Sequence, residues 1–258
     1  MDAARHHEQV LDQFTRQADP FLKRHAGSGD ALLALMAGCA ALPPESTLLD
    51  VACGPGIVSC FFANRVRHVT GLDTVPAMLE RARHFQQEKQ LTNLDWVHGQ
   101  SDALPFADAS FDCVVSRFAL HHFLDPLAAL REMKRVCRRG GTVLIADVTP
   151  PAETQKKFNL WEVLRDPSHT RALTAGEMRA LGDEAGLQLH REEQFAMPMQ
   201  LETLLGGSFP RPGDADRIRV LFEEDIRSGI DSLGVAARLQ ENAIWLTYPV
   251  LVLAWNRE

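Results

Sequence analysis

The chain has 258 residues, a length that suits one α/β domain with additions rather than two independent cores. Its formal net charge of -7 argues against a protein that grips nucleic acid through a concentrated basic surface. No apolar run reaches the roughly 18 residues of a membrane-spanning helix, and the charged residues 1–25 lack the apolar stretch of a signal peptide, so we expect a cytoplasmic protein without membrane insertion.

Short apolar, β-branched runs alternate with longer amphipathic stretches from Thr47 onward, which is typical of a parallel sheet covered by helices on both faces. The predicted strands span 47–52, 68–73, 94–99, 111–116 and 141–147, and the predicted helices between them span 56–65, 75–90 and 125–137. Right-handed crossovers make this segment, 46–150, an open, doubly wound α/β sheet that we expect to bind a cofactor. Residues 1–45 are expected to form a helical cap outside the sheet.

The pattern is less regular over residues 151–258, which we expect to form the substrate side. Thr174 and Glu177 make a capping box that predicts a helix through Ala185. The other predicted elements are a strand at 187–195, a mostly helical insertion at about 197–240 and a last strand at 244–255. Pro249 in the last strand suits a sheet edge or a bulge, because proline has no N–H for the ladder.

The five cysteines lie in apolar or glycine-containing surroundings and form no CxxC pair. They are Cys39, Cys53, Cys60, Cys113 and Cys137. This usage is typical of reduced, buried thiols in a cytosolic protein, so we expect neither a disulfide nor a zinc site.

The segment 48–56, LLDVACGPG, runs from an apolar strand into an acidic, glycine-rich turn and then into a helix. Glycines allow a ligand close to the backbone, and open α/β sheets bind ligands at the carboxyl ends of their strands. The segment therefore predicts a pocket at this turn. A GxG turn that only connects a strand tightly to a helix is the alternative.

Two further acidic segments come after the next two predicted strands. Asp73 ends the second strand about twenty residues after the first turn, where nucleotide-binding folds hold ribose hydroxyls; the alternative is a helix cap. The segment 99–106, GQSDALPF, comes after the third strand and offers acceptors for an adenine amino group, although alone it is typical of an ordinary loop. Because the carboxyl ends of the strands meet at one edge, the three acidic positions should converge.

Four segments together resemble the ubiquinone and menaquinone biosynthesis type of class I S-adenosylmethionine-dependent methyltransferase and its uncharacterised small-molecule relatives. They are LLDVACGPG at 48–56, GLDTVPAML at 71–79, GQSDALPFADASFD at 99–112 and SRFALHHFLDP at 116–126. The resemblance covers about residues 48–148 and implies a Rossmann-like sheet of seven strands in the order 3-2-1-4-5-7-6, the last strand antiparallel. It also implies methyl transfer from S-adenosylmethionine to a small molecule, with S-adenosylhomocysteine as the product.

The same resemblance implies which residues contact the cofactor. The glycine-rich segment would face the methionine portion, the acid after the second strand the ribose, the third segment the adenine edge, and the residues after the fourth strand the floor beneath the cofactor. An early aromatic residue closes over the cofactor in this family, and Phe14 is its candidate here. The complete set is Phe14, Asp50, Ala52, Gly54, Gly56, Asp73, Thr74, Met78, Ser101, Asp102, Ala103, Arg117, Phe118 and His122.

Two other functions remain as alternatives. The third small residue of the dinucleotide-binding GxGxxG pattern is Ser59 here, and Pro55 stiffens the turn, so an NAD-dependent oxidoreductase is the minor alternative. The second alternative is a catalytically silent homologue that only binds S-adenosylmethionine or S-adenosylhomocysteine.

Methyl transfer from a sulfonium is an in-line displacement, in which the protein chiefly aligns the reactants and excludes water. A hydroxyl or carbon nucleophile also needs a base. His121 comes after the fourth predicted strand and Asp147 ends the fifth, so both should lie where substrate meets cofactor. The alternatives are that the histidine packs or binds backbone, and that the acid only ends its strand or caps the next segment.

The segment 164–171, LRDPSHTR, concentrates two arginines, a histidine and an acid in a loop above the strand ends. Arg165 and Arg171 would clamp an anionic or amide-bearing substrate, and His169 would act as a base. Trp161 would line an apolar acceptor pocket. The alternatives are a polar connection before the next helix and a core position for Trp161. The sequence points to no metal, and it is compatible with a homodimer.

Overall fold

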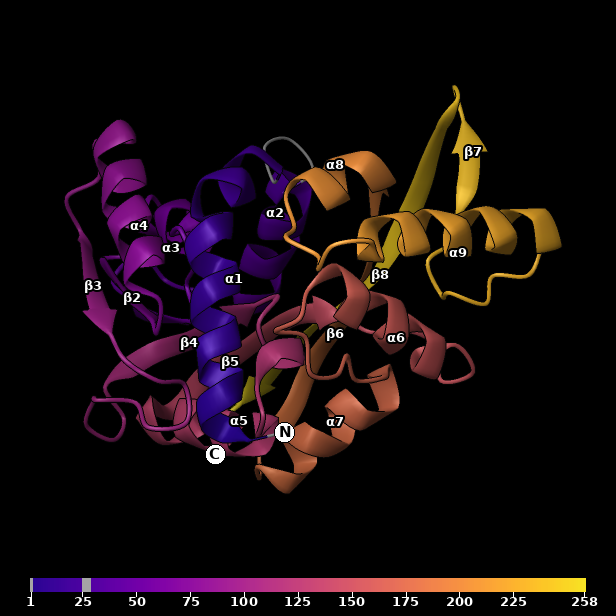
Figure 1. The fold of residues 1–258 in the computed structure, drawn as a ribbon. Coiled ribbons are helices and arrows are strands. Elements are labelled where there is room, and N and C mark those ends of the chain that lie inside the picture. The colour runs from indigo at the N-terminus through magenta and orange to yellow at the C-terminus, as the bar shows by residue number, and fades with distance from the viewer. Residues whose placement is uncertain (1, 25–28) are drawn as a thin grey trace.

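The computed structural model describes residues 2–24 and 29–258, and it shows one sheet with helices on both faces (Figure 1). The strands are β1 (Thr47–Val51), β2 (His68–Asp73), β3 (Leu94–His98), β4 (Phe111–Arg117), β5 (Cys137–Val148), β6 (Gln188–Gln200), β7 (Arg238–Gln240) and β8 (Ala243–Asn256). They take the order β3-β2-β1-β4-β5-β8-β6, in which β8 runs antiparallel between β5 and β6. The predicted topology is confirmed, and the short β7, which pairs with β8, is one strand more than predicted.

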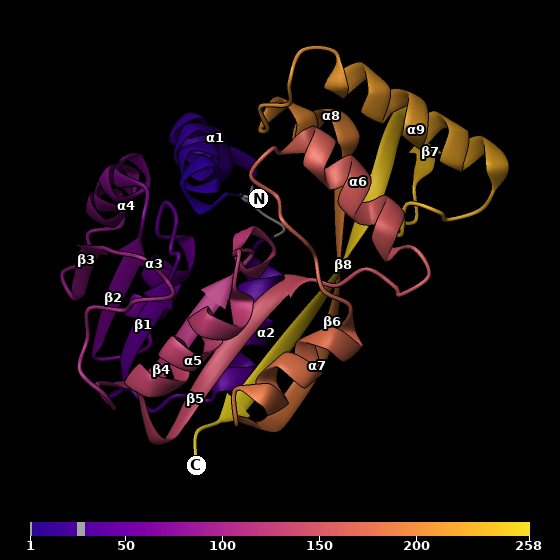
Figure 2. The same ribbon diagram turned by 60° about the horizontal axis from the view of Figure 1, so that its bottom comes forward.

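Helices surround the sheet in three groups (Figure 2). They are α1 (Ala3–Arg24), α2 (Gly29–Ala40), α3 (Ile57–Ala63), α4 (Pro76–Glu88), α5 (Pro126–Val136), α6 (Gln155–Arg165), α7 (Ala175–Glu184), α8 (Leu201–Gly206) and α9 (Asp214–Ser228), with a 3-10 turn η1 (Leu120–His122). Helices α2, α3 and α4 pack on one face, and α5 and α7 pack on the other. Helices α6, α8 and α9 gather beside the outer halves of β6 and β8. None of the helices in the described residues has the length and apolar character needed to cross a bilayer.

Local capping explains where two of these helices begin. Thr174 Oγ1 accepts a hydrogen bond from the Glu177 backbone N–H, and the Glu177 carboxylate accepts one from the Thr174 backbone N–H, so the predicted capping box is confirmed. Asp125 caps α5 in the same way by accepting from the backbone N–H of Ala128. These caps fix the two helices that cover the second face of the sheet.

Helix α2 differs from the expectation that residues 1–45 lie outside the sheet. Its Leu32 and Met36 are fully buried in the main core, where the helix covers the face shared with α3. Only α1 lies apart, across the carboxyl ends of the parallel strands (Figure 2). Residues 1 and 25–28 of the predicted cap fall outside the described part of the chain.

Pro249 lies in a strand with neighbours on both sides, rather than at an edge. Its carbonyl accepts from the Thr149 backbone N–H, while the pairing of β8 with β5 ends at Val250 and the pairing with β7 begins only at Trp245. In an antiparallel strand the N and the C=O of one residue point to the same side. The nitrogen of Pro249 therefore points to the side of β5 and β7, between the last pair with β5 and the first pair with β7, so neither of these two strands needs the missing N–H as a donor. The proline therefore marks the point where β8 changes partners.

Two elements of the second half extend beyond the prediction. Strand β6 continues through Pro198 to Gln200, so the insertion begins about four residues later than expected. The whole of α6 lies in a segment for which no helix is predicted, and it places Arg165 on its last turn. Tertiary packing accounts for α6, because its Phe158 and Trp161 are completely buried against β8 and α9.

Candidate functional site

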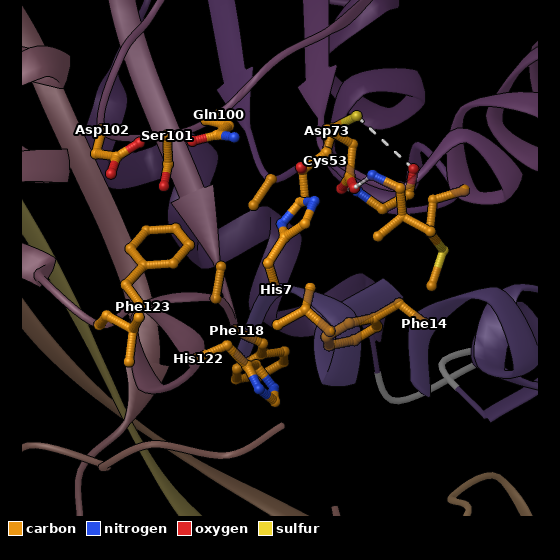
Figure 3. A pocket seen from close by; sticks show the side chains of 18 of the residues that line it. His7, Phe14, Cys53, Asp73, Gln100, Ser101, Asp102, Phe118, His122 and Phe123 are labelled. Atoms are coloured by element: carbon orange, nitrogen blue, oxygen red, sulfur yellow. Dashed lines mark hydrogen bonds between the residues drawn. The ribbon is translucent and has the colours of Figure 1, made fainter. Parts of the chain in front are cut away.

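A cavity of about 610 Å³ opens at the carboxyl ends of β1, β2 and β4 and is covered by α1 (Figure 3). Its walls come from the first turns of α1 and from the loops after four parallel strands. It is lined by the predicted cofactor residues Phe14, Asp50, Ala52, Gly54, Asp73, Thr74, Met78, Ser101, Asp102, Arg117, Phe118 and His122. The structure therefore brings together three acidic segments that are spread over about fifty residues of sequence.

Asp50 lies on β1 at the back of this cavity and is almost completely buried. Its Oδ2 accepts a hydrogen bond of 2.6 Å from the Ser59 hydroxyl on α3. Burial raises the pKa of Asp50 to about 7, and the hydrogen bond from Ser59 offsets that rise only in part. This carboxyl is poised to ionise when a cationic group arrives. Ser59, at the third position of the GxGxxG pattern, is thus the partner of the first acid.

Asp73 ties the first two strand-end loops together. Its two oxygens accept backbone hydrogen bonds of 2.7 Å from Gly54 and 2.8 Å from Val75. Burial raises the pKa of Asp73 to about 6, although these backbone donors counter the rise. A carboxylate has about four acceptor positions, so the side chain can still bind a ligand hydroxyl while it orders both loops.

The glycine-rich turn has an unusual backbone that explains its sequence. Ala52 and Gly54 have φ angles of 56° and 53°, in the left-handed region, which turns the chain sharply away from β1. Gly56 also has a positive φ, of 83°, but it does not line the cavity. A Cβ at Gly56 would lie 2.6 Å from the indole of Trp96, so this glycine allows α3 to pack closely on the sheet. Gly56 thus has a packing role against Trp96, and its predicted contact with the cofactor stays a prediction.

The third segment contributes Gln100, Ser101 and Asp102 to the cavity wall, opposite Phe14 and Phe118 (Figure 3). Ala103 pairs with Gln100 in an isolated bridge and is absent from the lining, so it differs from the prediction. The bridge turns the chain back on itself after Asp102.

Helix α1 is held over the cavity by contacts to the η1 turn and beyond. His6 Nε2 lies 2.7 Å from the backbone oxygen of His122, and the Phe14 ring packs edge-on against the His122 ring at 4.9 Å between centroids. Further along the helix, Gln17 donates to Asp166 Oδ2 at 2.9 Å. The sequence singles out only Phe14 in this helix, because its other lining residues, Ala3, Ala4, His6, His7 and Val10, carry no recognisable motif.

His121 and Asp147 form a buried pair behind the floor of the cavity. His121 Nδ1 lies 2.5 Å from Asp147 Oδ1, and both residues are more than nine-tenths buried. Burial lowers the pKa of His121, but the charge and hydrogen bond of Asp147 outweigh it, so the pKa is raised above the ordinary 6.5. Asp147 also accepts from the Val148 backbone N–H at 2.7 Å, which fixes the carboxylate. His121 and Asp147, two predicted catalytic candidates that are 26 residues apart in the sequence, thus form one hydrogen-bonded pair.

A second, smaller cavity of about 60 Å³ adjoins the first and shares three of its wall residues, Phe14, Phe118 and His122. It is also lined by His121, by the apolar side chains of Val148, Met197, Met199 and Leu204, and by the polar group of Gln17, Glu162, Arg165, Asp166 and Tyr248. The sequence predicts no role for Glu162 or Tyr248, because no sequence pattern links a helix at 162 to a strand at 248.

Arg165 lies in a buried ionic network rather than in an open loop. Its Nε and one terminal nitrogen donate to Glu162 Oε2 at 2.9 and 2.6 Å, and the other terminal nitrogen donates to Ser208 at 3.1 Å. The Tyr248 hydroxyl donates to the remaining Glu162 oxygen at 2.5 Å. Asp166 lies 3.9 Å from the guanidinium on its far side. Arg165 therefore meets two carboxylates of the protein, which corrects the prediction that it clamps an anionic substrate.

The other substrate-side candidates lie outside both cavities. Trp161 is fully buried and packs on Phe222, which is the core position that the sequence left open. Arg171 is exposed and pairs with Glu177, so it does not reach the site. His169 is buried with Nε2 2.7 Å from Asn159 Oδ1, and burial lowers its pKa well below the ordinary range. His169 is thus a neutral ring packed beside His121, at 5.5 Å between centroids, and the predicted role as base does not suit this position.

The described residues gather no group of three histidine, cysteine or acidic side chains with the arrangement of a metal site.

Known proteins resemble this chain in sequence and in fold. Residues 49–145 match the family model described as a methyltransferase domain. The chain is 30% identical over 208 residues to the uncharacterised methyltransferase YcgJ of Bacillus subtilis (strain 168), a match that covers 79% of this chain and 81% of that protein. It is 38% identical over 109 residues to demethylmenaquinone methyltransferase of Listeria welshimeri, covering 41% of this chain and 46% of that protein. The crystal structure of YcgJ has a TM-score of 0.80 and 28% identity to this chain, over 88% of it and 98% of that chain.

Proposed function

This chain belongs to the class I S-adenosylmethionine-dependent methyltransferases, and from this membership we propose that it methylates a small molecule held between the large cavity and the smaller one behind it. The observation that carries the proposal is the convergence of Asp50, Asp73 and Asp102 on one covered cavity. Three acidic strand-end loops around a single space suit a ligand with a cationic end, a ribose and an adenine.

The residues of the large cavity would fit the cofactor in one orientation. Asp73, which orders both loops, would accept from the ribose hydroxyls, with Thr74 and Met78 beside the adenine. Ser101 and Asp102 would meet the adenine edge. Asp50 lies deepest and would face the cationic methionine portion, whose charge stabilises its ionised form. A cavity of about 610 Å³ lies within the usual size of small-molecule sites.

S-adenosylmethionine supplies an electrophilic methyl group, and the remaining task of the chain is alignment and exclusion of water. Phe14 closes the cavity from above, and Phe118 and His122 form its floor. Phe118 has a φ of 53°, which is costly for an aromatic residue and fixes its ring at the point where the two cavities adjoin. These three residues would surround the transferring group.

A small acceptor is supported by the covering helix α1 and by the limited volume of the second cavity, which leave no room for a polymer at the reacting point. A cytoplasmic location is part of the same proposal, because all five cysteines are buried as free thiols, which suits a reducing compartment.

Calorimetry and labelled-methyl transfer test the proposal. The purified chain should bind S-adenosylhomocysteine and S-adenosylmethionine but not NAD, and it should transfer a labelled methyl group from S-adenosylmethionine to a component of a metabolite extract. Binding of NAD with no response to either sulfur compound would contradict the proposal. Binding without transfer to any extract would favour the catalytically silent homologue instead.

A further inference from the structure

The second cavity lies behind the floor of the first, and the two share Phe14, Phe118 and His122. Its volume of about 60 Å³ corresponds to roughly four to six water molecules, enough for the reacting end of a small organic molecule. Its wall combines apolar side chains from β5, β6 and α8 with a few fixed polar groups. That combination is typical of a site that binds an apolar body and orients one functional group.

His121 is the polar residue of this cavity that is arranged to exchange a proton. Asp147 holds its Nδ1 at 2.5 Å, which selects the tautomer that leaves Nε2 as an acceptor when the ring is neutral. Within the described residues, Nε2 of His121 has no hydrogen-bond partner. The pair therefore has the geometry of a base oriented by a carboxylate.

The other charges of the cavity are already matched within the protein. Arg165 donates twice to Glu162, whose second oxygen accepts from Tyr248. Asp166 accepts from the backbone and hydroxyl of Ser168 and from Gln17. An anionic acceptor would find no free cation among these groups and would face the excess of carboxylates. A cationic acceptor would find each carboxylate occupied.

We propose that the second cavity binds the reacting end of a neutral, hydroxyl-bearing acceptor, a phenol or an apolar alcohol, and that Nε2 of His121 removes the hydroxyl proton. This inference rests on the proposed function, because it requires the adenosyl group to occupy the first cavity. It adds the chemical class of the acceptor, which the fold alone does not specify.

The reaction at this site conserves atoms, electrons and charge. The acceptor oxygen forms a bond to the methyl carbon, the carbon–sulfur bond breaks with its electron pair remaining on sulfur, and the hydroxyl proton passes to Nε2 of His121. The products are a methyl ether, S-adenosylhomocysteine and an imidazolium that returns its proton to solvent. A neutral amine would attack without such a base, so an oriented base favours a hydroxyl nucleophile.

Proton removal by His121 makes the step dependent on pH, and the titratable and charged groups around the ring set the direction. They are Asp147 on β5, His122 on η1, Glu162 and Arg165 on α6, and Asp166 and His169 in the loop after α6. The ring is a base only when neutral. Because Asp147 raises the pKa of His121, methyl transfer should increase as the pH rises through a midpoint above 6.5.

Binding of matched probes to the complex with S-adenosylhomocysteine tests the acceptor class. The probes are 4-methylphenol, 4-methylbenzoate and 4-methylbenzylammonium, measured by saturation-transfer NMR. The phenol should bind with a Kd on the order of 1 mM, the two ions at least several-fold more weakly, and its ring protons next to the hydroxyl should show NOEs to the His121 ring. Equal or tighter binding of either ion, or no binding of the phenol, would overturn the inference.

A second measurement monitors the His121 ring itself by NMR titration. In Asp147→Asn the midpoint of His121 should fall by about one to three pH units, and transfer of labelled methyl to 4-methylphenol should be lost. The matched control is Asp95→Asn, which removes the carboxylate from the exposed pair of His68 and Asp95, 3.0 Å apart, and should leave both readouts unchanged. An unchanged titration of His121 in Asp147→Asn would refute the role of the pair.

The outcomes separate this inference from the proposed function. If S-adenosylhomocysteine binds but the phenol does not, the acceptor class is wrong and the cofactor site stands. If S-adenosylhomocysteine itself fails to bind, the proposed function fails first.

Discussion

The two sides of the site are built in different ways. On the cofactor side, three short segments between Asp50 and Asp102 each end a strand and carry their own acidic residue, and backbone hydrogen bonds hold them in place. On the acceptor side, the residues come from five elements spread along the chain: Phe14 from α1, His121 from η1, Asp147 from β5, Glu162 and Arg165 from α6, and Tyr248 from β8. The acidic residues of the cofactor side therefore lie within about fifty residues of sequence, whereas folding brings together the residues of the acceptor side from distant parts of the chain.

This difference separates the sources of stability and of binding. The cofactor side contains carboxyls whose pKa values are raised by burial, so their ionised forms are unfavourable until a cationic ligand binds. The acceptor side contains carboxylates that are matched by Arg165, Tyr248 and backbone donors, so its polar groups stabilise the folded chain. Substitutions on the two sides should therefore change different measured quantities.

The largest expected effect is on stability, for Arg165→Ala. Removing the guanidinium leaves Glu162 buried with one hydroxyl donor and no cation, which should lower the free energy of unfolding by about 3–5 kcal/mol. Urea unfolding monitored by circular dichroism measures it. The control is Arg219→Ala, which removes an equally two-pronged pair with Glu202 that lies on the surface and should cost less than about 1 kcal/mol. A similar loss of unfolding free energy in the two variants would show that the buried network does not stabilise the acceptor side more than a surface ion pair does.

The sequence predicts the cofactor side well because its signals are local. Strands β1 to β4 end within a residue or so of the predicted ends, and the acids at 50, 73 and 102 reach the same cavity. Two residues of these motifs, Gly56 and Ala103, do not line the cavity, because their surroundings depend on packing that the motifs do not specify. Trp96 occupies the space beside Gly56, and nothing in the motif itself identifies that neighbour.

The acceptor side can be predicted only as separate candidates. His121 and Asp147 are recognisable individually, and their pairing depends on β4 and β5 lying side by side. Helix α6 has no side-chain cap at Thr154 and forms because its apolar face packs on distant elements, so its ion pairs could not be anticipated. Arg171 and Trp161 illustrate the same limit, since the charge of one and the size of the other suggest a pocket that neither reaches.

The next effect is on cofactor binding, for Asp73→Ala. The ribose hydroxyls lose a charged acceptor, and Gly54 and Val75 lose the acceptor that orders their loops, so the affinity for S-adenosylhomocysteine should fall by about 1.5–3 kcal/mol. Calorimetry measures it, with Asp95→Ala, an exposed acid on the neighbouring strand, as the control. An unchanged dissociation constant for Asp73→Ala would remove this residue from the ribose site.

A smaller effect of opposite sign is expected on stability for Asp50→Asn. Because burial raises its pKa to about 7, the folded chain binds a proton that the unfolded chain has lost between pH 3.8 and about 7, and stability falls as the pH rises through this window. The amide removes the buried charge and still accepts from Ser59, so the variant should be more stable by about 1–2 kcal/mol at pH 8. The gain should vanish near pH 3, where Asp50 is protonated in the folded chain and largely so in the unfolded chain. A loss of stability at pH 8 would show that the charge is already balanced without a ligand.

The smallest effect is the pH dependence of S-adenosylmethionine affinity in the unmodified chain. Asp50 and Asp73, with pKa values of about 7 and 6, are partly protonated in the free chain at pH 5.5 and must ionise to attract a cationic ligand and accept from its hydroxyls. Binding therefore releases protons, and the affinity should rise by about fourfold between pH 6.5 and 7.5 before it levels off. Calorimetry in buffers of different ionisation enthalpy counts the protons released. Asp50→Asn should remove the part of the rise centred near pH 7 and keep the part near pH 6. An affinity that does not change with pH would mean that the two acids do not share one cationic ligand. The cofactor side would then not differ from the acceptor side in having carboxyls that ionise only when a ligand binds.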